Sequence, residues 1–414
     1  MGPVRTRWAE KTFARKTKIL QFTSGGSPLF FTSPVKGRHA GATILMEDKH
    51  IQYMRRALAH AEKARGRTSP NPMVGAVVVK GGKVVGEGYH SRAGHPHAEI
   101  EALRRAGAKA RSADLYVNLE PCCHFGRTPP CTDAIIQAGI KRVFVGMKDP
   151  NSLVSGKGLR TLKAQGIAVA SGVLKEECEK LNESFIKVMK TGMPFVILKT
   201  AMSLDGKIAT RSGNSRWITG KPARNHVHKI RNQVDAILVG TETVLKDNPR
   251  LTCRLETGTV KHPVRIILDR RNRIPLTANI FKNSRSQKVI YVAGPDISSR
   301  RLKTLVDRKV EVLKGKSSKN GFHIKPLLKE LANRELNSIL IEGGAELNAS
   351  VVKAGVVDRV IAFISPILIG GTQAPGFLGG QGVMKVDGAM KLKDITVTKI
   401  GEDLMVEATP CSAE

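Results

Sequence analysis

Three side chains of this 414-residue chain, His97, Cys122 and Cys131, are of types that could bind one metal ion together. One imidazole and two thiolates can hold zinc at three corners of a tetrahedron, which leaves the fourth position open to water. An open position is typical of catalytic zinc, which lowers the pKa of its bound water toward neutrality. Glu99 follows His97 by two residues and could carry protons without binding the metal. These residue types predict a hydrolytic zinc centre with Glu99 as the catalytic acid and base.

The spacing of these residues narrows the chemistry. His97-Ala98-Glu99 and Pro121-Cys122 match the H-x-E and P-C parts of the zinc-dependent nucleobase deaminase signature, but eight residues rather than two separate Cys122 from Cys131. This widened loop resembles the deaminase half of the bifunctional riboflavin-biosynthesis deaminase/reductase. Upstream segments occur in the order of that family, namely residues 69–79 (SPNPMVGAVVV), 88–90 (GYH) and 94–99 (GHPHAE).

The same residues are also compatible with a structural zinc site or with no metal site. A structural zinc site needs a fourth ligand, which Cys123 or His124 could supply. The two cysteines and the histidine could also be core residues that bind no metal. The choice of Cys122 over Cys123 rests on the motif, and His97 is preferred to His95 because only His97 stands two residues before a glutamate.

A second candidate site lies in the other half of the chain, at residues 339–347 (ILIEGGAEL). This pattern predicts a strand that turns through paired glycines into a helix, where backbone N–H groups could approach a phosphate. A tight turn without a ligand would give the same pattern. No G-x-G-x-x-G motif is present, so a Rossmann dinucleotide site is not supported.

The resemblance continues into this second half. Three segments are similar to the reductase half of the same family: residues 199–207 (KTAMSLDGK), 215–219 (SRWIT) and 240–249 (GTETVLKDNP). The resemblance therefore covers nearly everything from Met46 to the C-terminus. It implies a bifunctional enzyme, a hydrolase and an NADPH-dependent oxidoreductase. The implied steps are zinc-dependent hydrolytic deamination of 2,5-diamino-6-(5-phosphoribosylamino)pyrimidin-4(3H)-one and reduction of the ribosyl chain to ribityl.

The resemblance also implies roles for single residues. Asn71 would contact the pyrimidine, and Lys199 or Glu342 would stabilise or protonate an imine, or simply bind the substrate. The residues expected to line NADPH are Ala201, Trp217, Thr243, Asp247 and Gly344. Those expected to hold the phosphoribosyl substrate are Ser215, Arg231, Leu251, Arg254 and Glu342. Arginine suits two-pronged phosphate contacts, although a Trp or Arg here could instead serve packing or surface charge.

Alternation of strand and helix patterns predicts an α/β protein with two domains, as the length suggests. The resemblance implies a cytidine-deaminase-like three-layer domain at residues 46–191, followed by a dihydrofolate-reductase-like α/β domain at residues 192–414. The first has predicted helices at 48–64, 98–106, 132–138 and 176–189 and strands at 74–79, 83–86, 114–118 and 143–146. The second has predicted strands at 195–200, 236–239, 264–268, 289–292, 338–341 and 360–364. Residues 191–194 (TGMP) are a predicted linker.

The net charge of +33 leaves nucleic acid to be considered as a partner. A tRNA base deaminase is the main alternative function. Two further alternatives are an RNA-binding protein with a structural zinc and a chain in which only one half is active. Because the basic residues are dispersed and aromatic residues are few, we expect a small phosphorylated pyrimidine as substrate instead of nucleic acid. The related enzymes imply a homo-oligomer.

Six cysteines, clustered only at the zinc motif, suit a reducing compartment. No apolar run approaches the ~18 residues of a membrane span, so we expect a cytoplasmic protein without membrane contact. Residues 1–45 are basic and lack a core-like pattern. They are interpreted as a disordered extension, with organellar targeting as the alternative.

Overall fold

The structure of the protein is a computed structural model that describes residues 48–125, 129–151, 154–319 and 321–411. The extension expected over residues 1–45 lies outside the described residues. The described residues contain two large sheets. No helix in the described ranges is both long and apolar enough to cross a bilayer.

The first sheet has five strands in the order β2-β1-β3-β4-β5. Strand β1 runs antiparallel to β2 and β3, whereas β3, β4 and β5 are mutually parallel. Four strands lie within a few residues of their predicted ranges, and the short, largely exposed β5 was not predicted. The bounds are β1 (Gly75–Lys80), β2 (Lys83–Tyr89), β3 (Asp114–Leu119), β4 (Arg142–Met147) and β5 (Ala168–Ser171).

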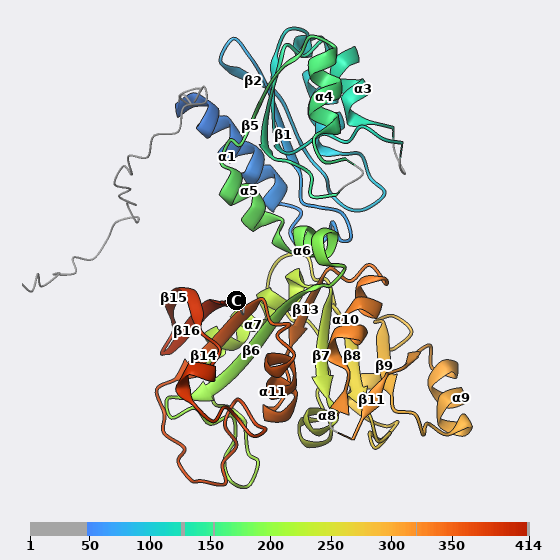
Figure 1. The fold of residues 1–414 in the computed structure, drawn as a ribbon, viewed down its shortest axis with the longest axis vertical. Helices are drawn as coiled ribbons and strands as arrows, with labels where there is room; N and C mark the ends of the chain where they lie inside the picture. The colour runs from blue at the N-terminus through green and yellow to red at the C-terminus, as the bar shows by residue number, and fades with distance from the viewer. Residues whose placement is uncertain (1–47, 126–128, 152–153, 320, 412–414) are drawn as a thin grey trace, which may run out of the picture. The chain divides into compact units, whose positions relative to one another are not determined.

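Helices cover both faces of this sheet, which confirms the predicted three-layer arrangement (Figure 1). Helices α1 (Asp48–Glu62) and α5 (Lys175–Leu181) lie on one face. The other face carries α2 (Ala98–Ala106), the 3-10 turn η1 (Gly107–Ala110), α3 (Cys131–Gln137) and α4 (Lys157–Ala164).

Two helices lie directly on strand backbone because glycines face them. A Cβ atom added to Gly75 would lie 2.0 Å from the Ala57 carbonyl oxygen of α1, and one on Gly88 would lie 2.6 Å from the Ala98 oxygen of α2. Neither separation is sterically possible, so both positions require glycine for close approach. The position of α2 matters because its first turn carries Glu99.

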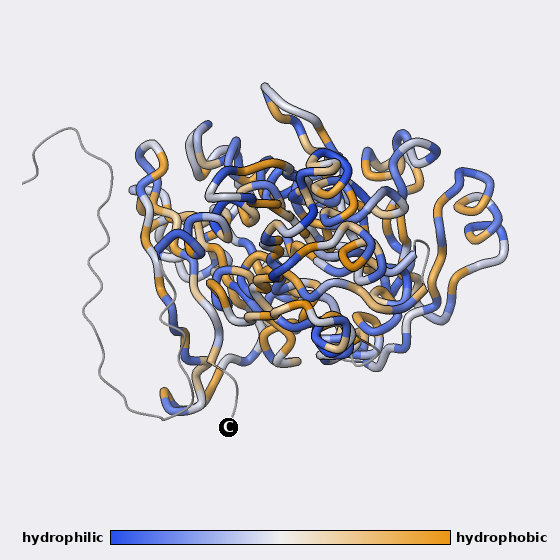
Figure 2. Tube along the Cα trace, turned by 90° about the horizontal axis from the view of Figure 1, so that it is seen from above, coloured by the Kyte–Doolittle hydropathy of each residue, from blue (hydrophilic) through white to orange (hydrophobic). Residues whose placement is uncertain are grey.

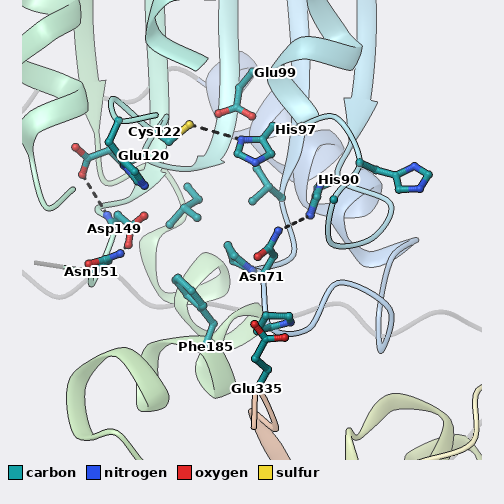
Figure 3. Close-up of a pocket in the computed structure, with 17 residues that line it drawn as sticks. Asn71, His90, His97, Glu99, Glu120, Cys122, Asp149, Asn151, Phe185 and Glu335 are labelled. Carbon is teal, nitrogen blue, oxygen red and sulfur yellow. Dashed lines mark hydrogen bonds between the residues drawn. The ribbon is translucent and has the colours of Figure 1, made fainter. Parts of the chain in front are cut away.

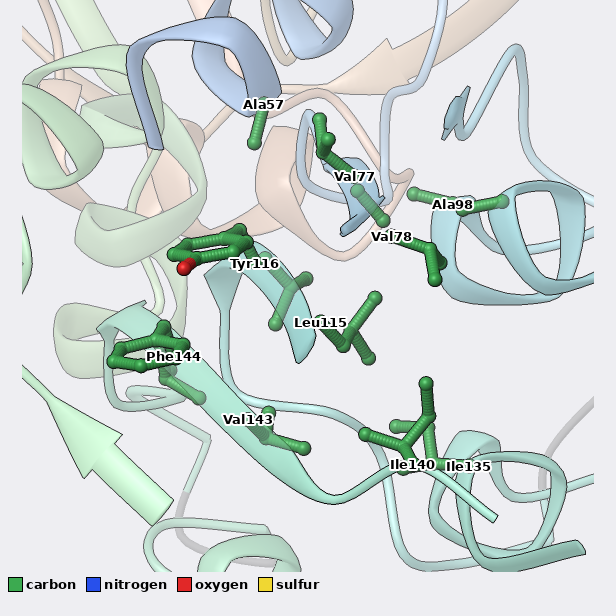
Figure 4. Packing of buried hydrophobic residues seen from close by; sticks show 14 of the residues in the cluster. Ala57, Val77, Val78, Ala98, Leu115, Tyr116, Ile135, Ile140, Val143 and Phe144 are labelled. Carbon is green, nitrogen blue, oxygen red and sulfur yellow. The ribbon is translucent and has the colours of Figure 1, made fainter. Parts of the chain in front are cut away.

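The core between these layers consists of the strand side chains that face the helices, with Leu115 and Ile135 fully buried. Tyr116 and Phe144 stack with ring centroids 4.7 Å apart (Figure 4). The Tyr116 hydroxyl is hydrogen-bonded to Nδ1 of His50 at 2.8 Å, so its polar end is satisfied inside the core. In Figure 2 hydrophobic segments gather in the middle of the view, and some also occur on outer loops.

One helix predicted as continuous is interrupted in the structure. Residues 176–189 form two helices, α5 and α6 (Glu183–Thr191), which break at Asn182. The buried Asn182 side chain accepts a hydrogen bond from the Met73 amide at 2.8 Å and donates one to the Met73 carbonyl at 3.0 Å. This long-range pairing draws Asn182 out of helical geometry, and a local hydrophobic pattern does not reveal it.

The second sheet has nine strands in the order β10-β9-β8-β7-β13-β6-β14-β16-β15. The first seven strands in this order, which end with β14, are parallel to one another. The last two, β16 and β15, are antiparallel to their neighbours. The parallel strands are β6 (Phe195–Ser203), β7 (Ala236–Gly240), β8 (Val264–Asp269), β9 (Val289–Ala293), β10 (Glu311–Lys314), β13 (Ser338–Ile341) and β14 (Arg359–Ser365). The antiparallel ones are β15 (Leu392–Ile400) and β16 (Asp403–Pro410).

Helices connect the parallel strands, and the carboxyl ends of β7, β13 and β6 lie next to one another. In open α/β sheets ligands bind beyond such ends, so this edge is where the second site is expected. The helices are α7 (Lys221–Gln233), α8 (Thr241–Asp247), α9 (Ser299–Asp307), α10 (Ile324–Ala332) and α11 (Ala345–Lys353). Short elements are η2 (Asn279–Phe281), β11 (Ser317–Ser318), β12 (Gly321–Phe322) and η3 (Val386–Gly388).

Candidate active sites

The structure brings His97, Cys122 and Cys131 together from three segments. His97 is the residue before α2, Cys122 follows β3 in the loop, and Cys131 is the first residue of α3. Their ligand atoms all lie within 4.8 Å of one another, and Nδ1 of His97 is 3.2 Å from Cys131 Sγ and 3.6 Å from Cys122 Sγ. Within the described ranges no fourth His, Cys, Asp or Glu joins the group. A three-ligand set favours an open, catalytic metal site over a closed structural one.

The chemistry of the two thiols fits a metal site. A hydrogen bond from Cys131 lowers the pKa of the Cys122 thiol to about 4, and His97 contributes to the same shift. The amide of Cys131 also points at Cys122 Sγ, at 3.3 Å. Cys122 is therefore a thiolate at neutral pH, which is the form that binds metal, whereas the pKa of Cys131 is raised by its hydrogen bond to Cys122 and by burial.

Glu99 lies in the first turn of α2, beside this cluster (Figure 3). The side chain is only 3% exposed, and burial raises its pKa above the ordinary glutamate value. A buried carboxyl group with a raised pKa next to a metal-binding cluster is suited to accept and return a proton.

The cluster opens into a cavity of about 370 Å³. His90 donates through Nδ1 to the Pro96 carbonyl at 3.1 Å, which leaves Nε2 to accept from the Asn71 side-chain amide at 3.0 Å. Burial lowers the pKa of His90, so the imidazole is neutral and this pairing persists at neutral pH. Asn71 is thereby fixed with its carbonyl oxygen as the remaining acceptor (Figure 3).

Two acidic residues of the cavity were not singled out from the sequence. Glu120, which is buried, accepts hydrogen bonds from the amides of Asp149 at 3.1 Å, Gly156 at 2.9 Å and Leu159 at 3.3 Å. It therefore fixes the loop that carries Asp149. Burial raises the pKa of Asp149 to about 6. The only sequence signal was that Glu120 directly precedes Pro121-Cys122.

In the second half, Lys199, Arg231 and Glu342 form a buried charged cluster. The Arg231 guanidinium donates to both oxygens of Glu342 at 2.7 Å, and Lys199 Nζ lies 3.8 Å from the same carboxylate. Burial alone would raise the pKa of Glu342, but the charges of Arg231 and Lys199 hold it at about 2. Burial lowers the pKa of Lys199. Lys199 is on β6 and Glu342 follows β13, so adjacent strands position them.

The remaining residues predicted for the second site are distributed over β6, α8, the start of α11 and the loops around them. Ala201 is near the end of β6, Thr243 and Asp247 are on α8, and Gly344 is the residue before α11. Ser215 Oγ donates to Asp247 at 3.5 Å. Trp217 is 69% exposed and stacks against the Arg224 guanidinium, 4.3 Å from the ring centroid, so it is not a core residue. Leu251 is buried and Arg254 is exposed in the loop that follows α8.

Comparison with known protein families assigns both halves. Residues 47–147 match the cytidine and deoxycytidylate deaminase zinc-binding region, and residues 194–406 match the RibD C-terminal domain. The chain is thus a bifunctional enzyme, a deaminase with a zinc-binding-type domain followed by a reductase. The riboflavin biosynthesis protein RibD of Actinobacillus pleuropneumoniae is 43% identical over 86% of this chain and 94% of its own length. That of Aquifex aeolicus is 45% identical over 86% of this chain and 96% of its own. The chain belongs to the RibD family.

Solved structures agree with this assignment. Acinetobacter baumannii RibD, form 1, superimposes with a TM-score of 0.81 at 38% identity, covering 88% of this chain and 99% of that one. A diaminohydroxyphosphoribosylaminopyrimidine deaminase/5-amino-6-(5-phosphoribosylamino)uracil reductase from Thermotoga maritima gives 0.79 at 40% identity, with the same coverage. The fold class, the family and the bifunctional activity predicted from the sequence are confirmed.

Proposed function

We propose that this chain deaminates 2,5-diamino-6-(5-phosphoribosylamino)pyrimidin-4(3H)-one and then reduces the ribosyl chain of the product to ribityl. The observation that carries the proposal is the three-ligand cluster of His97, Cys122 and Cys131, which opens into a cavity with buried Glu99 beside it. Residues 46–191 would form the deaminase domain and residues 192–414 the reductase domain.

Zinc fits this cluster, because a neutral imidazole and two thiolates are its preferred ligands. When bound, zinc would supply an activated water as the nucleophile. Glu99 would take a proton from the nucleophile and return it to the leaving amine, so that ammonia departs. Asn71, held by His90, would accept a hydrogen bond from the pyrimidine through its fixed carbonyl oxygen.

In the reductase site, Arg231 and Arg254 would bind the phosphoribosyl group, with Ser215 and Leu251 next to it. Lys199 and Glu342 form an ion pair at 3.8 Å, and both would lie next to the substrate. Lys199 could protonate an imine of the opened ribosyl chain, and the ionised Glu342 could stabilise the positive charge that forms. The hydride itself would come from the cofactor, and the protein would orient and polarise the substrate.

The residues at the sheet edge fit NADPH. Helix α11 begins at Ala345 after two glycines, and in the described part of the chain no side chain caps this helix start. A Cβ atom on Gly344 would have only Thr243 Oγ1 nearby, at 3.8 Å, so the turn leaves open space for a phosphate. Ala201, Thr243 and Asp247 would line the cofactor there, and Trp217 would offer its exposed ring.

The test is a coupled assay with purified protein and the diaminopyrimidinone phosphate, in which ammonia release and NADPH oxidation are followed separately. We expect ammonia release to require zinc and NADPH oxidation to follow it. If zinc-loaded protein gives neither signal, the proposal fails. Deamination of tRNA adenosine or cytidine by the same preparation, without NADPH oxidation, would favour a nucleic-acid deaminase instead.

Asp149→Asn is expected to stabilise the protein and impair deamination at the same time. The folded carboxyl group keeps its proton up to about pH 6, well above its ordinary pKa of 3.8, so its ionisation at pH 7 disfavours the folded state. Asparagine should therefore raise the free energy of unfolding at pH 7 by about 2 kcal/mol. This gain should shrink as the pH falls from 6 toward 4, since the wild-type carboxyl group then becomes neutral. Urea unfolding of zinc-loaded protein at pH 7 and pH 5 measures the difference.

A carboxylate retained at such a cost is expected to serve the reaction, so kcat/KM for ammonia release should fall at least about tenfold in the same variant. Asp114→Asn, at the half-buried start of β3 and outside the cavity lining, where the carboxylate pairs with Arg142, is the matched control and should keep full deaminase activity. An Asp149 variant that is both more stable and fully active would show that this residue has no part in substrate binding.

A second copy of the chain is the proposed partner of strand β15. This strand is at the edge of the nine-stranded sheet, so its outer backbone groups can pair with another strand. Exposed apolar side chains occur on it and just before it: Val383, Met384, Val386, Ile395 and Val397. A patch of this kind, repeated on an identical chain, can pair across a twofold axis.

We therefore expect the wild-type protein to be a homo-oligomer in light scattering at micromolar concentration. The double variant Met384→Glu/Val386→Glu should shift toward the monomer, because each glutamate would bury a charge in the interface. Lys385→Glu, between them, reverses the charge at a position that is already charged and should leave the assembly intact. A monomeric wild type would refute this interface.

A further inference from the structure

The loop of residues 251–254 carries two of the residues proposed to hold the phosphoribosyl substrate, Leu251 and Arg254. It lies between α8 and β8 and belongs to neither a helix nor a strand. Leu251 has a φ of +50°, a left-handed conformation that a branched side chain rarely adopts without external support. The conformation of this loop must therefore be fixed by groups from elsewhere in the chain.

Those groups come mainly from one face of α7. Arg231 Nη1 donates to the Thr252 carbonyl at 3.1 Å. The next residue, Cys253, donates its thiol to the His228 carbonyl at 3.2 Å. The Arg254 amide then donates to His228 Nδ1 at 3.3 Å. Three successive loop residues are thus each tied to the same helix.

A second imidazole acts in the same way from outside the helix. Nδ1 of His262 accepts a hydrogen bond from the Cys253 amide at 3.3 Å. Two neighbouring amides are therefore both received by histidine Nδ1 atoms, which requires each ring to carry no proton on that nitrogen. A backbone carbonyl acceptor would not depend on protonation, whereas these two imidazoles do.

The surroundings of His228 favour the neutral ring, whose Nδ1 can accept a hydrogen bond. The ring is 9% exposed and lies among Arg231, Arg254 and Lys199, with Glu342 as the one opposing charge. Burial and these three cations lower its pKa to about 4. His228 is therefore neutral across the range in which the enzyme would be assayed, and its Nδ1 stays available to the Arg254 amide.

We infer that His228 is a positioning residue of the reductase, which holds the backbone of Arg254 so that its guanidinium meets the phosphate ester of the substrate. This inference rests on the proposed function, since it takes the 251–254 loop to be part of the substrate site. His228 itself acts through the loop and does not touch the reacting atoms. His262 supports it through the preceding amide.

Three full-length variants test the inference. His228→Leu keeps the volume but removes the acceptor, and His228→Asn places an amide oxygen near the position of Nδ1. His226→Leu, on the same helix but outside the loop contacts, is the control. Each is assayed for NADPH oxidation with the deaminated phosphoribosyl substrate, for ribose 5-phosphate binding by calorimetry, and for hydrogen exchange at the amides of residues 252–254.

We expect His228→Leu to raise KM roughly tenfold, as for an unsatisfied amide, with kcat changed less than about twofold. Exchange at the Arg254 amide should accelerate and ribose 5-phosphate should bind more weakly, whereas His228→Asn and His226→Leu should resemble wild type in all three measurements. Unchanged exchange at Arg254, an unchanged KM, or a loss confined to kcat would overturn the inference. If wild type oxidises no NADPH with this substrate, the proposed function fails, and exchange together with ribose 5-phosphate binding still decides the role of His228.

Discussion

Glu99→Gln is expected to slow ammonia release by about a thousandfold, which lies within the usual contribution of a general acid and base. Glutamine has the same shape as glutamate and can keep its hydrogen bonds, but it can neither take up nor return a proton at neutral pH. Because Glu99 is 3% exposed, bulk buffer cannot readily replace it as a proton carrier. The loss should appear in kcat, with little change in KM, since the pyrimidine would be held by other residues such as Asn71.

Two measurements show whether the loss of rate is due to proton transfer alone and not to loss of zinc or of the second activity. Zinc content should stay near one ion per chain, because Glu99 is not part of the three-ligand cluster. NADPH oxidation with supplied deaminated substrate should be unchanged, which separates the two activities. Glu101→Gln, two residues further along α2 and paired with Arg104 at the surface, is the matched control and should retain deaminase activity. A Glu99 variant that keeps more than a tenth of the rate would remove this residue from the mechanism.

Arg231→Ala should lower the free energy of unfolding by about 3–5 kcal/mol and abolish measurable reductase activity. The substitution removes the two-pronged partner of Glu342 and leaves a buried carboxylate with only Lys199, at 3.8 Å. Glu342 has a folded pKa of about 2, below its ordinary value of 4.5, so it is ionised throughout the neutral range. The stability it gains from Arg231 is therefore complete above about pH 4.5 and is lost only as the pH falls toward 2.

A second substitution distinguishes the unpaired charge from a simple loss of packing. Adding Glu342→Gln to Arg231→Ala should recover part of the stability, because no ionised group then remains without its partner. Reductase activity should stay absent, since both side chains are proposed to act at the substrate. Urea unfolding of the two variants and of wild type measures the coupling. A destabilisation below about 1 kcal/mol for Arg231→Ala would show that Glu342 finds other compensation.

The metal-binding cluster could be predicted from the sequence because its three residues belong to a recognisable motif at the ends of regular elements. His97 and Cys131 stand at the starts of α2 and α3, and Cys122 follows β3, so each position is determined by the end of a regular element. Buried strands with continuous apolar runs, such as β1 and β13, were also predicted within a few residues. Their hydrophobic pattern reflects burial on both faces, which a sequence displays directly.

Features that depend on distant partners could not be predicted. Asn182 interrupts a helix because it pairs with Met73, more than a hundred residues away. Glu120 acts on amides of residues 149–159, and His90 acts on Asn71, through contacts that only the fold creates. Strand β15 was missed for another reason: its alternation of apolar and polar residues is confined to Ile395–Thr398, and nearly all its residues are exposed, so no core-facing pattern marks the whole strand.

The glycines beneath α2 bear on how this enzyme could be redesigned. Ala98 and Ala102 of the helix approach strand β2 so closely that a single methyl group at Gly86 or Gly88 would collide with helix backbone. The helix that presents His97 and Glu99 thus has no room to slide or tilt inward. Engineering toward a different nucleobase should leave this helix untouched and vary the segments on the opposite side of the cavity, at Asn71 and around Asp149 and Asn151. Those segments are loops, whose length and composition can change without shifting the reactive groups.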